Sequence, residues 1–213
     1  NYKDGNFSLY VSMLNPVKGQ KVEVKVLSAA GKQLFCQSKN ITSPTDTLLH
    51  FAKQFQNVQP WNAENPYLYT LVITSTDKNG KVQESVAQPF GFRTIEMKNG
   101  QLLVNGVAIT IKGVNRQEHN AVHGRTLSID EMVKDVKMMK QFNINAVRTS
   151  HYPNYSEWYK LCEKYGLYMV DEANIECHGI LDTEFKQLAD REDWYPAFHD
   201  RMYRMIKRDR NQT

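Results

Sequence analysis

The fold is decided by residues 128–173, which read SIDEMVKDVKMMKQFNINAVRTSHYPNYSEWYKLCEKYGLYMVDEA. Apolar residues recur at steps of three and four over residues 128–142 and 154–165, which predicts two amphipathic helices. Short apolar runs at residues 145–150 and 167–173 indicate strands. Alternation of strands with helices predicts a parallel sheet with helical crossovers.

Both predicted helices carry end signals. Ser128 and Glu131 form an S-x-x-E capping box, in which each side chain binds a backbone N–H of the other residue. Asn154, with Glu157 three residues later, marks the expected start of the second helix. Gly166 marks its end, because glycine readily takes the left-handed conformation that closes a helix.

The alternation extends in both directions. We expect a strand at residues 108–114 and a third helix at residues 194–208. A complete eightfold barrel takes about 250 residues, so we predict the first three βα units of a TIM (β/α)8 barrel, truncated before the fourth strand. An open doubly wound sheet is the alternative, but the loop after the first strand lacks the GxGxxG typical of its nucleotide-binding versions.

The N-terminal part has a different period. Apolar residues alternate with polar ones, which predicts short strands at residues 8–13, 22–27, 32–36, 48–55, 68–75 and 82–88. Turn signals at residues 30–32 and 77–80 join two pairs of strands as hairpins. We therefore predict an immunoglobulin-like β-sandwich at residues 1–91, followed by the barrel part at residues 92–213.

Composition is that of an ordinary globular protein, with 41% hydrophobic and 23% charged residues. No apolar run is long enough to cross a bilayer and no targeting segment is recognisable, so we expect no membrane partner. Cytoplasm and periplasm both stay open as compartments. The chain starts at Asn1 without an initiator Met and ends just after a helical run, so we expect it to be cut from a longer protein.

The net charge of +4 is modest, but basic residues crowd the last stretch of the chain. Apolar residues at helical spacing lie on the other side of that stretch, so we interpret it as a solvated helix face and expect no nucleic-acid partner. The three cysteines, Cys36, Cys162 and Cys177, are odd in number and widely spaced, which fits free thiols better than disulfides or a zinc site.

Polar residues gather where the predicted parallel strands end. Active-site residues of barrels lie at the carboxyl ends of strands and in the loops that follow. The three predicted strands are followed or closed by Asn115, Arg116, Gln117, Glu118 and His119; by Arg148 and His151; and by Asp171, Glu172, Asn174, Glu176 and His178. We expect these clusters to meet at one end of the barrel, the rim formed by the carboxyl ends of its strands.

Several interpretations of these residues stay open from the residues alone. Glu176 and His178, with His119, His123 and His151, could form the metal site of a barrel hydrolase. Asp171 and Glu172 could instead cap helices, or pair with Arg148 or Arg116. A non-catalytic carbohydrate-binding module would use Trp61 and Tyr67 as its surface, although large aromatics more often pack in a core.

Six motifs in order carry a family resemblance that covers nearly the whole chain. They are PWNAENPYLY at residues 60–69, GFRTI at 91–95, NG at 105–106, KGVNRQEH at 112–119, RTSHYPN at 148–154 and YGLYMVDEANIECHG at 165–179. Together they resemble glycoside hydrolase family 2, and the last of them resembles its β-galactosidase branch. Glucuronidases depart from that motif after Asp171 and Glu172.

The resemblance implies roles for particular residues. Glu176 and His178 match two protein ligands of an active-site Mg²⁺. His151 matches a residue that stabilises the transition state through the sugar, and Arg148 matches one that supports the nucleophilic carboxylate. Asn115, Gln117 and His119 match the substrate-binding side. Gln117 stands where the pattern commonly has histidine, and its amide can still bind a sugar hydroxyl.

The mechanism implied for the parent protein is retaining hydrolysis of a β-galactoside. Two glutamates about 5 to 5.5 Å apart act as acid/base and as nucleophile. In the family these glutamates close the fourth and seventh strands, and the acid/base glutamate is also the third Mg²⁺ ligand. We therefore expect this fragment to lack both catalytic glutamates and to be inactive alone, and we expect the parent to be a homo-oligomer.

Overall fold

The computed structural model describes residues 2–177 and 188–213. The chain divides into two compact units, one formed by Asn1–Ile109 with Thr213 and the other by Thr110–Gln212. Each unit has its own core. The predicted boundary between residues 91 and 92 stays a prediction.

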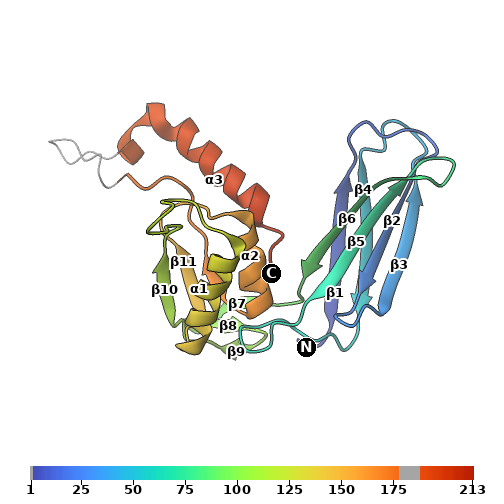
Figure 1. Ribbon diagram of the computed structural model, residues 1–213. Coiled ribbons are helices and arrows are strands. Elements are labelled where there is room, and N and C mark those ends of the chain that lie inside the picture. Colours follow the sequence, from blue (N-terminus) through green and yellow to red (C-terminus); the bar gives the residue numbers. More distant parts are fainter. Residues whose placement is uncertain (1, 178–187) are drawn as a thin grey trace. The chain divides into compact units, whose positions relative to one another are not determined.

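The first unit contains the predicted sandwich (Figure 1). A four-stranded antiparallel sheet has the order β3-β2-β5-β6, and a second sheet pairs β1 with β4. The strand bounds are Gly5–Ser12 (β1), Lys21–Leu27 (β2), Gln33–Asn40 (β3), Leu48–Phe55 (β4), Tyr69–Thr76 (β5) and Val82–Phe90 (β6). The two predicted hairpins, β2–β3 and β5–β6, are confirmed.

The sandwich core follows from the alternation in the sequence. Val22, Val24 and Val26 of β2 are completely buried, whereas the residues between them are not. They pack with Phe7 and Phe51 of the other sheet. Because successive strand residues point to opposite faces, one face of β2 is apolar.

A small antiparallel sheet completes the first unit. It has the order β7-β8-β9, with strands Ile95–Lys98 (β7), Gln101–Val104 (β8) and Val107–Ala108 (β9). The expected strand at residues 108–114 is wrong, because β9 ends at Ala108 and the next strand starts at Gly113. Between them the side chain of Asn145 accepts from Lys112 N at 2.8 Å and donates to Thr110 O at 2.9 Å. A side chain there takes the place of a strand partner.

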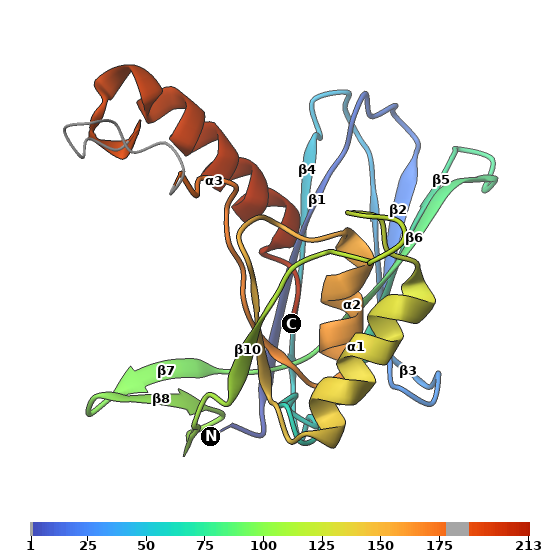
Figure 2. The same ribbon diagram turned by 60° about the vertical axis from the view of Figure 1, so that its left-hand side comes forward.

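The second unit contains the predicted βα units. Its sheet has the order β10-β11-β12, all parallel, with strands Gly113–Arg116 (β10), Ala146–Thr149 (β11) and Tyr168–Val170 (β12). Helices Ile129–Gln141 (α1) and Ser156–Tyr165 (α2) lie side by side (Figure 2). The core joins Met132 and Val136 of α1 to Val147 of β11 and Trp158 of α2. The start of a TIM barrel is thus confirmed.

The remaining segment of the second unit is helical. Two short 3-10 turns at Leu188–Asp190 and Glu192–Trp194 lead into α3, Tyr195–Asp209, which has no buried residue in the described part of the chain. In the same part, no helix has the length and apolarity that a membrane span requires. None of the three cysteines forms a disulfide among the described residues; Cys36 is exposed and Cys162 is buried.

The helix-end predictions had different outcomes. Ser128 caps α1 with the complete capping box, and Gly166 closes α2 in the left-handed conformation at φ 76°. Asn154, however, does not cap α2, which starts at Ser156 after Tyr155. Asn154 is instead buried, and its side-chain oxygen accepts from Arg116 Nη1 at 2.8 Å.

The capping box gives a test of α1. Replacement of Ser128 by Ala should lower the free energy of unfolding by about 1 kcal/mol, because the backbone N–H of Glu131 loses its acceptor, Ser128 Oγ. Urea denaturation followed by far-UV circular dichroism measures the change. Ser156→Ala is the matched control, because α2 has no side-chain cap hydrogen bond among the described residues. Equal losses in both variants would contradict the role of the box.

Candidate active site

Parallel pairing brings the ends of β10, β11 and β12 together. Asn115 lies opposite Arg148, and Arg148 lies opposite Val170, after which the chain continues into Asp171 and Glu172. Because all three strands run in the same direction, their carboxyl ends meet at one edge of the sheet. This is the edge at which barrel enzymes carry their active sites.

The carboxylate of Glu172 is the centre of the polar cluster at this edge. Arg148 Nε donates to its Oε1, and His151 Nδ1 lies 3.0 Å from its Oε2. Arg148 Nη1 also donates to Asn115 Oδ1 at 3.4 Å. The structure thus brings together three predicted site residues, Asn115, Arg148 and His151. Glu172 pairs with Arg148, which was one of the alternative interpretations of Glu172.

These contacts define how His151 is held. Arg148 Nη2 is also 3.3 Å from His151 Nδ1, but a guanidinium only donates. The carboxylate only accepts, so its shorter contact favours a proton on Nδ1 and leaves Nε2 as the acceptor of the ring. The side chains of Arg148 and His151 keep 40% and 38% exposure. Both can therefore meet a ligand while Glu172 holds them.

A second layer of side chains lies beneath Glu172. Thr149 Oγ1 accepts from Glu172 N at 2.9 Å and donates to Asp171 Oδ1 at 3.3 Å. Tyr159 of α2 donates to the same Asp171 oxygen at 2.7 Å. Burial, together with the nearby carboxyl group of Asp209, raises the pKa of Asp171 to about 6, against the hydrogen bond from Tyr159. Sequence reasoning did not identify Thr149 or Tyr159, since neither residue type stands out.

Arg116 is buried below the rim rather than exposed on it. Its side chain is 4% exposed, and Nε donates to Asp135 Oδ2 of α1 at 3.0 Å. Nη1 donates to Asn154, and the guanidinium lies 3.7 Å from the ring centroid of Trp158. Among the described residues, Nη2 has no hydrogen-bond partner. Arg116 thus joins β10 to both helices and to the loop after β11.

The loops after β10 and β11 are tied to each other. Glu118 N donates to the Tyr152 hydroxyl at 3.1 Å, and Tyr155 N donates to Glu118 Oε1 at 2.9 Å. Gln117 and His119 on the first loop are exposed. Within the described residues, neither takes part in the hydrogen bonds and ion pairs around Glu172. Their substrate-binding roles stay predictions.

The predicted metal ligands are only partly described. Glu176 is exposed and offers the oxygen donor that Mg²⁺ prefers, whereas His178 lies outside the described residues. Among residues 2–177 and 188–213, no three His, Cys, Asp or Glu side chains gather as a metal site. The metal-hydrolase alternative, which also needed His119, His123 and His151, is therefore not supported.

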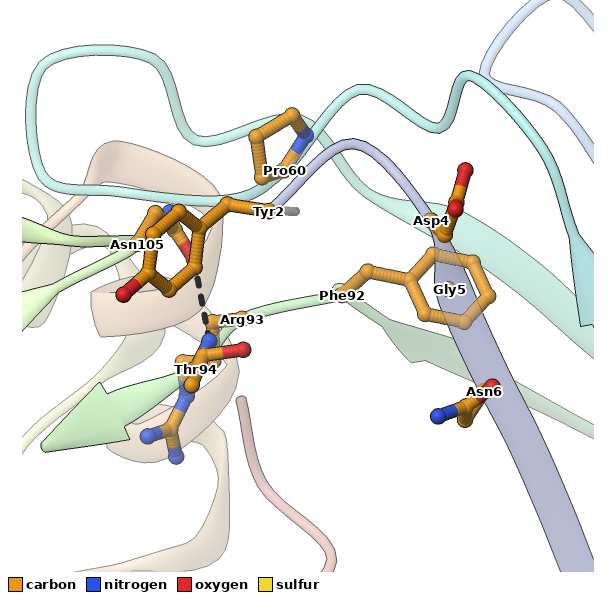
Figure 3. A pocket seen from close by; sticks show the side chains of 9 residues that line it. All are labelled: Tyr2, Asp4, Gly5, Asn6, Pro60, Phe92, Arg93, Thr94 and Asn105. Atoms are coloured by element: carbon orange, nitrogen blue, oxygen red, sulfur yellow. Dashed lines mark hydrogen bonds between the residues drawn. The ribbon is translucent and has the colours of Figure 1, made fainter.

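Trp61 and Tyr67 of the first unit do not form an exposed sugar platform. Trp61 is 1% exposed, and Tyr67 packs against the sandwich core. The carbohydrate-binding alternative is not supported. A separate small pocket lies beside Tyr2, Pro60 and Asn105, where Phe92 lies close against Gly5 (Figure 3). This pocket contains none of the predicted site residues.

A parallel βα sheet with a polar cluster at the carboxyl ends of its strands has the architecture of a barrel enzyme. Two family models match consecutive parts of the chain: glycosyl hydrolases family 2 over residues 2–93, and the TIM barrel domain of glycosyl hydrolases family 2 over residues 95–213. The chain therefore belongs to glycosyl hydrolase family 2.

Curated relatives in this family are β-galactosidases. The protein from Alteromonas mediterranea is 51% identical over 151 residues, covering 71% of this chain and 14% of the relative. The protein from Vibrio vulnificus (strain CMCP6) is 38% identical over 221 residues, covering 99% of this chain. The chain spans only 21% of that second relative.

Among solved structures, a β-glucuronidase from Bifidobacterium dentium, complexed with coumarin-3-O-glucuronide, is similar in fold. The TM-score is 0.85 at 24% identity, and the match covers 99% of this chain and 33% of that chain. The likeness supports the sandwich followed by the start of a barrel.

Arg116 gives a stability test of the second unit. Arg116→Met should lower the free energy of unfolding by about 2 kcal/mol, because the buried Asn154 loses its hydrogen-bond donor and the ion pairs with Asp135 and Glu118 are lost. Arg204→Met is the control, since the Arg204 side chain is 78% exposed and pairs with Asp200 on the surface. Urea unfolding of both variants measures the difference. A small loss in Arg116→Met would show that the buried network contributes little.

Asp171 gives a pH test. Its folded pKa is raised from 3.8 to about 6, so between these values the folded state binds more protons than the unfolded state. The stabilisation from this group is complete below about pH 4 and is lost as the pH rises through about 6. Asp171→Asn removes this titration. The free energy of unfolding of the unmutated chain, relative to that of this variant, should therefore fall as the pH rises from about 4 to about 6. Denaturation at a series of pH values measures it, and a constant difference would contradict the raised pKa.

Proposed function

We propose that this sequence is part of a longer retaining β-galactosidase of carbohydrate metabolism, which hydrolyses terminal β-D-galactosides. The observation that carries the proposal is the similarity to curated β-galactosidases, one of which matches 99% of this chain at 38% identity. The cluster of Arg148, His151 and Glu172 supports it, because these side chains lie where a barrel binds its substrate.

In the proposed reaction, the residues of this chain bind and orient. His151, held at Nδ1 by Glu172, presents Nε2 to a sugar hydroxyl and stabilises the transition state through the sugar. Arg148 supports the nucleophilic carboxylate with its fixed positive charge. Asn115, Gln117 and His119 bind further hydroxyl groups of the galactoside.

The two glutamates of a retaining mechanism are proposed to come from other parts of the longer protein. One protonates the leaving oxygen, and the other attacks the anomeric carbon to form a glycosyl-enzyme that water hydrolyses. We therefore expect the 213-residue chain to be inactive by itself.

Mg²⁺ is the proposed cofactor, with Glu176 and His178 as two of its protein ligands. The carboxylate of Glu176 suits this ion, because Mg²⁺ prefers oxygen donors and keeps several waters. When bound, the ion would supply positive charge beside the reacting carboxylates. We further propose a homo-oligomer without a nucleic-acid or membrane partner.

The proposed function predicts a substrate preference and an arginine effect in the longer protein. It should hydrolyse nitrophenyl β-galactoside in preference to nitrophenyl β-glucuronide, while the 213-residue chain should do neither. Arg148→Met should lower kcat/KM by about 10²- to 10³-fold, because a charged donor at the reacting centre is lost. Arg204→Met, on the exposed surface of α3, is the control.

Steady-state kinetics separate the outcomes of this test. A preference for the glucuronide would overturn the substrate class. Turnover by the 213-residue chain above background would overturn the proposal that its catalytic glutamates come from other parts of the longer protein. An unchanged kcat/KM in Arg148→Met would overturn the role of that residue.

A further inference from the structure

Thr149 occupies an unusual position for a polar side chain. It is the last residue of β11 and is completely buried, yet its hydroxyl group lies between two acidic residues that follow β12. Oγ1 accepts from the backbone N–H of Glu172 and donates to Asp171 Oδ1. Thr149 itself contributes nothing to the exposed rim.

The direction of the Thr149 hydroxyl group follows from its partners. A backbone N–H only donates, so Thr149 Oγ1 must accept from Glu172. Its own hydrogen is then directed to Asp171 Oδ1, which also accepts from the Tyr159 hydroxyl at 2.7 Å. Asp171 therefore fixes the rotation of the Thr149 hydroxyl, and α2 fixes Asp171 through Tyr159.

The position of Glu172 depends on this arrangement at its backbone. The side chain of Glu172 branches from the Cα that is bonded to this backbone nitrogen. Its two carboxylate oxygens contact Arg148 Nε and His151 Nδ1. A small displacement of the backbone would move both contacts together. Positions of reacting groups are sensitive at this scale, since a misplacement of about 1 Å can cost about 10²-fold in rate.

We propose that Thr149 and Asp171 are positioning residues that set the carboxylate of Glu172 against Arg148 and His151. The proposal rests on the proposed function for its effect on rate, but not for its effect on geometry. Thr149 is buried, so it acts through Glu172 and does not touch the sugar.

The kinetic test uses the longer protein and nitrophenyl β-galactoside. Thr149→Val keeps the shape and removes the hydroxyl group, so kcat should fall by about 10- to 100-fold with a smaller change in KM. Thr149→Ser restores the hydroxyl group and should recover most of kcat. Thr74→Val is the matched control, because its exposed hydroxyl group bonds Ser85 Oγ, at 3.2 Å, in the sandwich.

A spectroscopic test uses the 213-residue chain and needs no activity. NMR of the His151 ring and of Arg148 Nε–H should show shifted resonances in Thr149→Val and parental resonances in Thr149→Ser. Asp171→Asn keeps an acceptor oxygen and should resemble the parent, whereas Asp171→Ala should resemble Thr149→Val. Urea denaturation confirms that each variant is folded.

The two tests distinguish failure of this inference from failure of the proposed function. If the longer protein without substitutions hydrolyses no galactoside, the proposed function fails. The NMR result still decides the positioning role. If Thr149→Val matches the parent in kcat or in the His151 resonances, the positioning role is overturned. A loss in Thr149→Ser as large as that in Thr149→Val would show that a hydroxyl group at this position does not restore the function, and would overturn the positioning role as well.

Discussion

The second unit depends on the burial of one charged group, the guanidinium of Arg116. Removing a charge from water costs several kcal/mol unless hydrogen bonds and partners offset it. Arg116 meets this requirement with Asp135 from α1, Asn154 from the loop after β11, and the ring of Trp158 in α2. Any arrangement that separated these elements would leave the charge without partners. The same constraint fixes the loop that carries His151, three residues before Asn154.

The polar cluster at the rim is built on that fixed base. Arg148 and Thr149 are neighbours on β11, but alternation directs Arg148 to the half-exposed rim and buries Thr149. Glu172 is therefore held from two sides, by Thr149 at its backbone and by Arg148 and His151 at its carboxylate. An acidic residue held in this way can orient a histidine and an arginine while both stay open to a ligand.

Local signals in the sequence predicted the parts of the fold that depend on local contacts. The capping box at Ser128 and the closing Gly166 were predicted because each acts within four residues. Asn154 was misassigned as a cap because its partner, Arg116, is 38 residues away in the sequence. The gathering of Asn115, Arg148 and His151 was predictable from parallel strand ends. The support from Thr149 and Tyr159 was not, since their hydroxyl groups gain a role only through tertiary contacts.

The described residues also divide the proposed site into a part that this chain forms and a part that it does not. Glu172, Arg148 and His151 come from β11, β12 and their loops, and those two strands are paired with each other in full register. The contacts of Glu172 with Arg148, Thr149 and His151 are all made within this chain. Glu176 lies beyond β12, exposed and outside any three-residue metal cluster of the described chain. In the proposed function, a divalent ion bound by Glu176 requires further ligands, and we propose that these come from other strands of the longer protein.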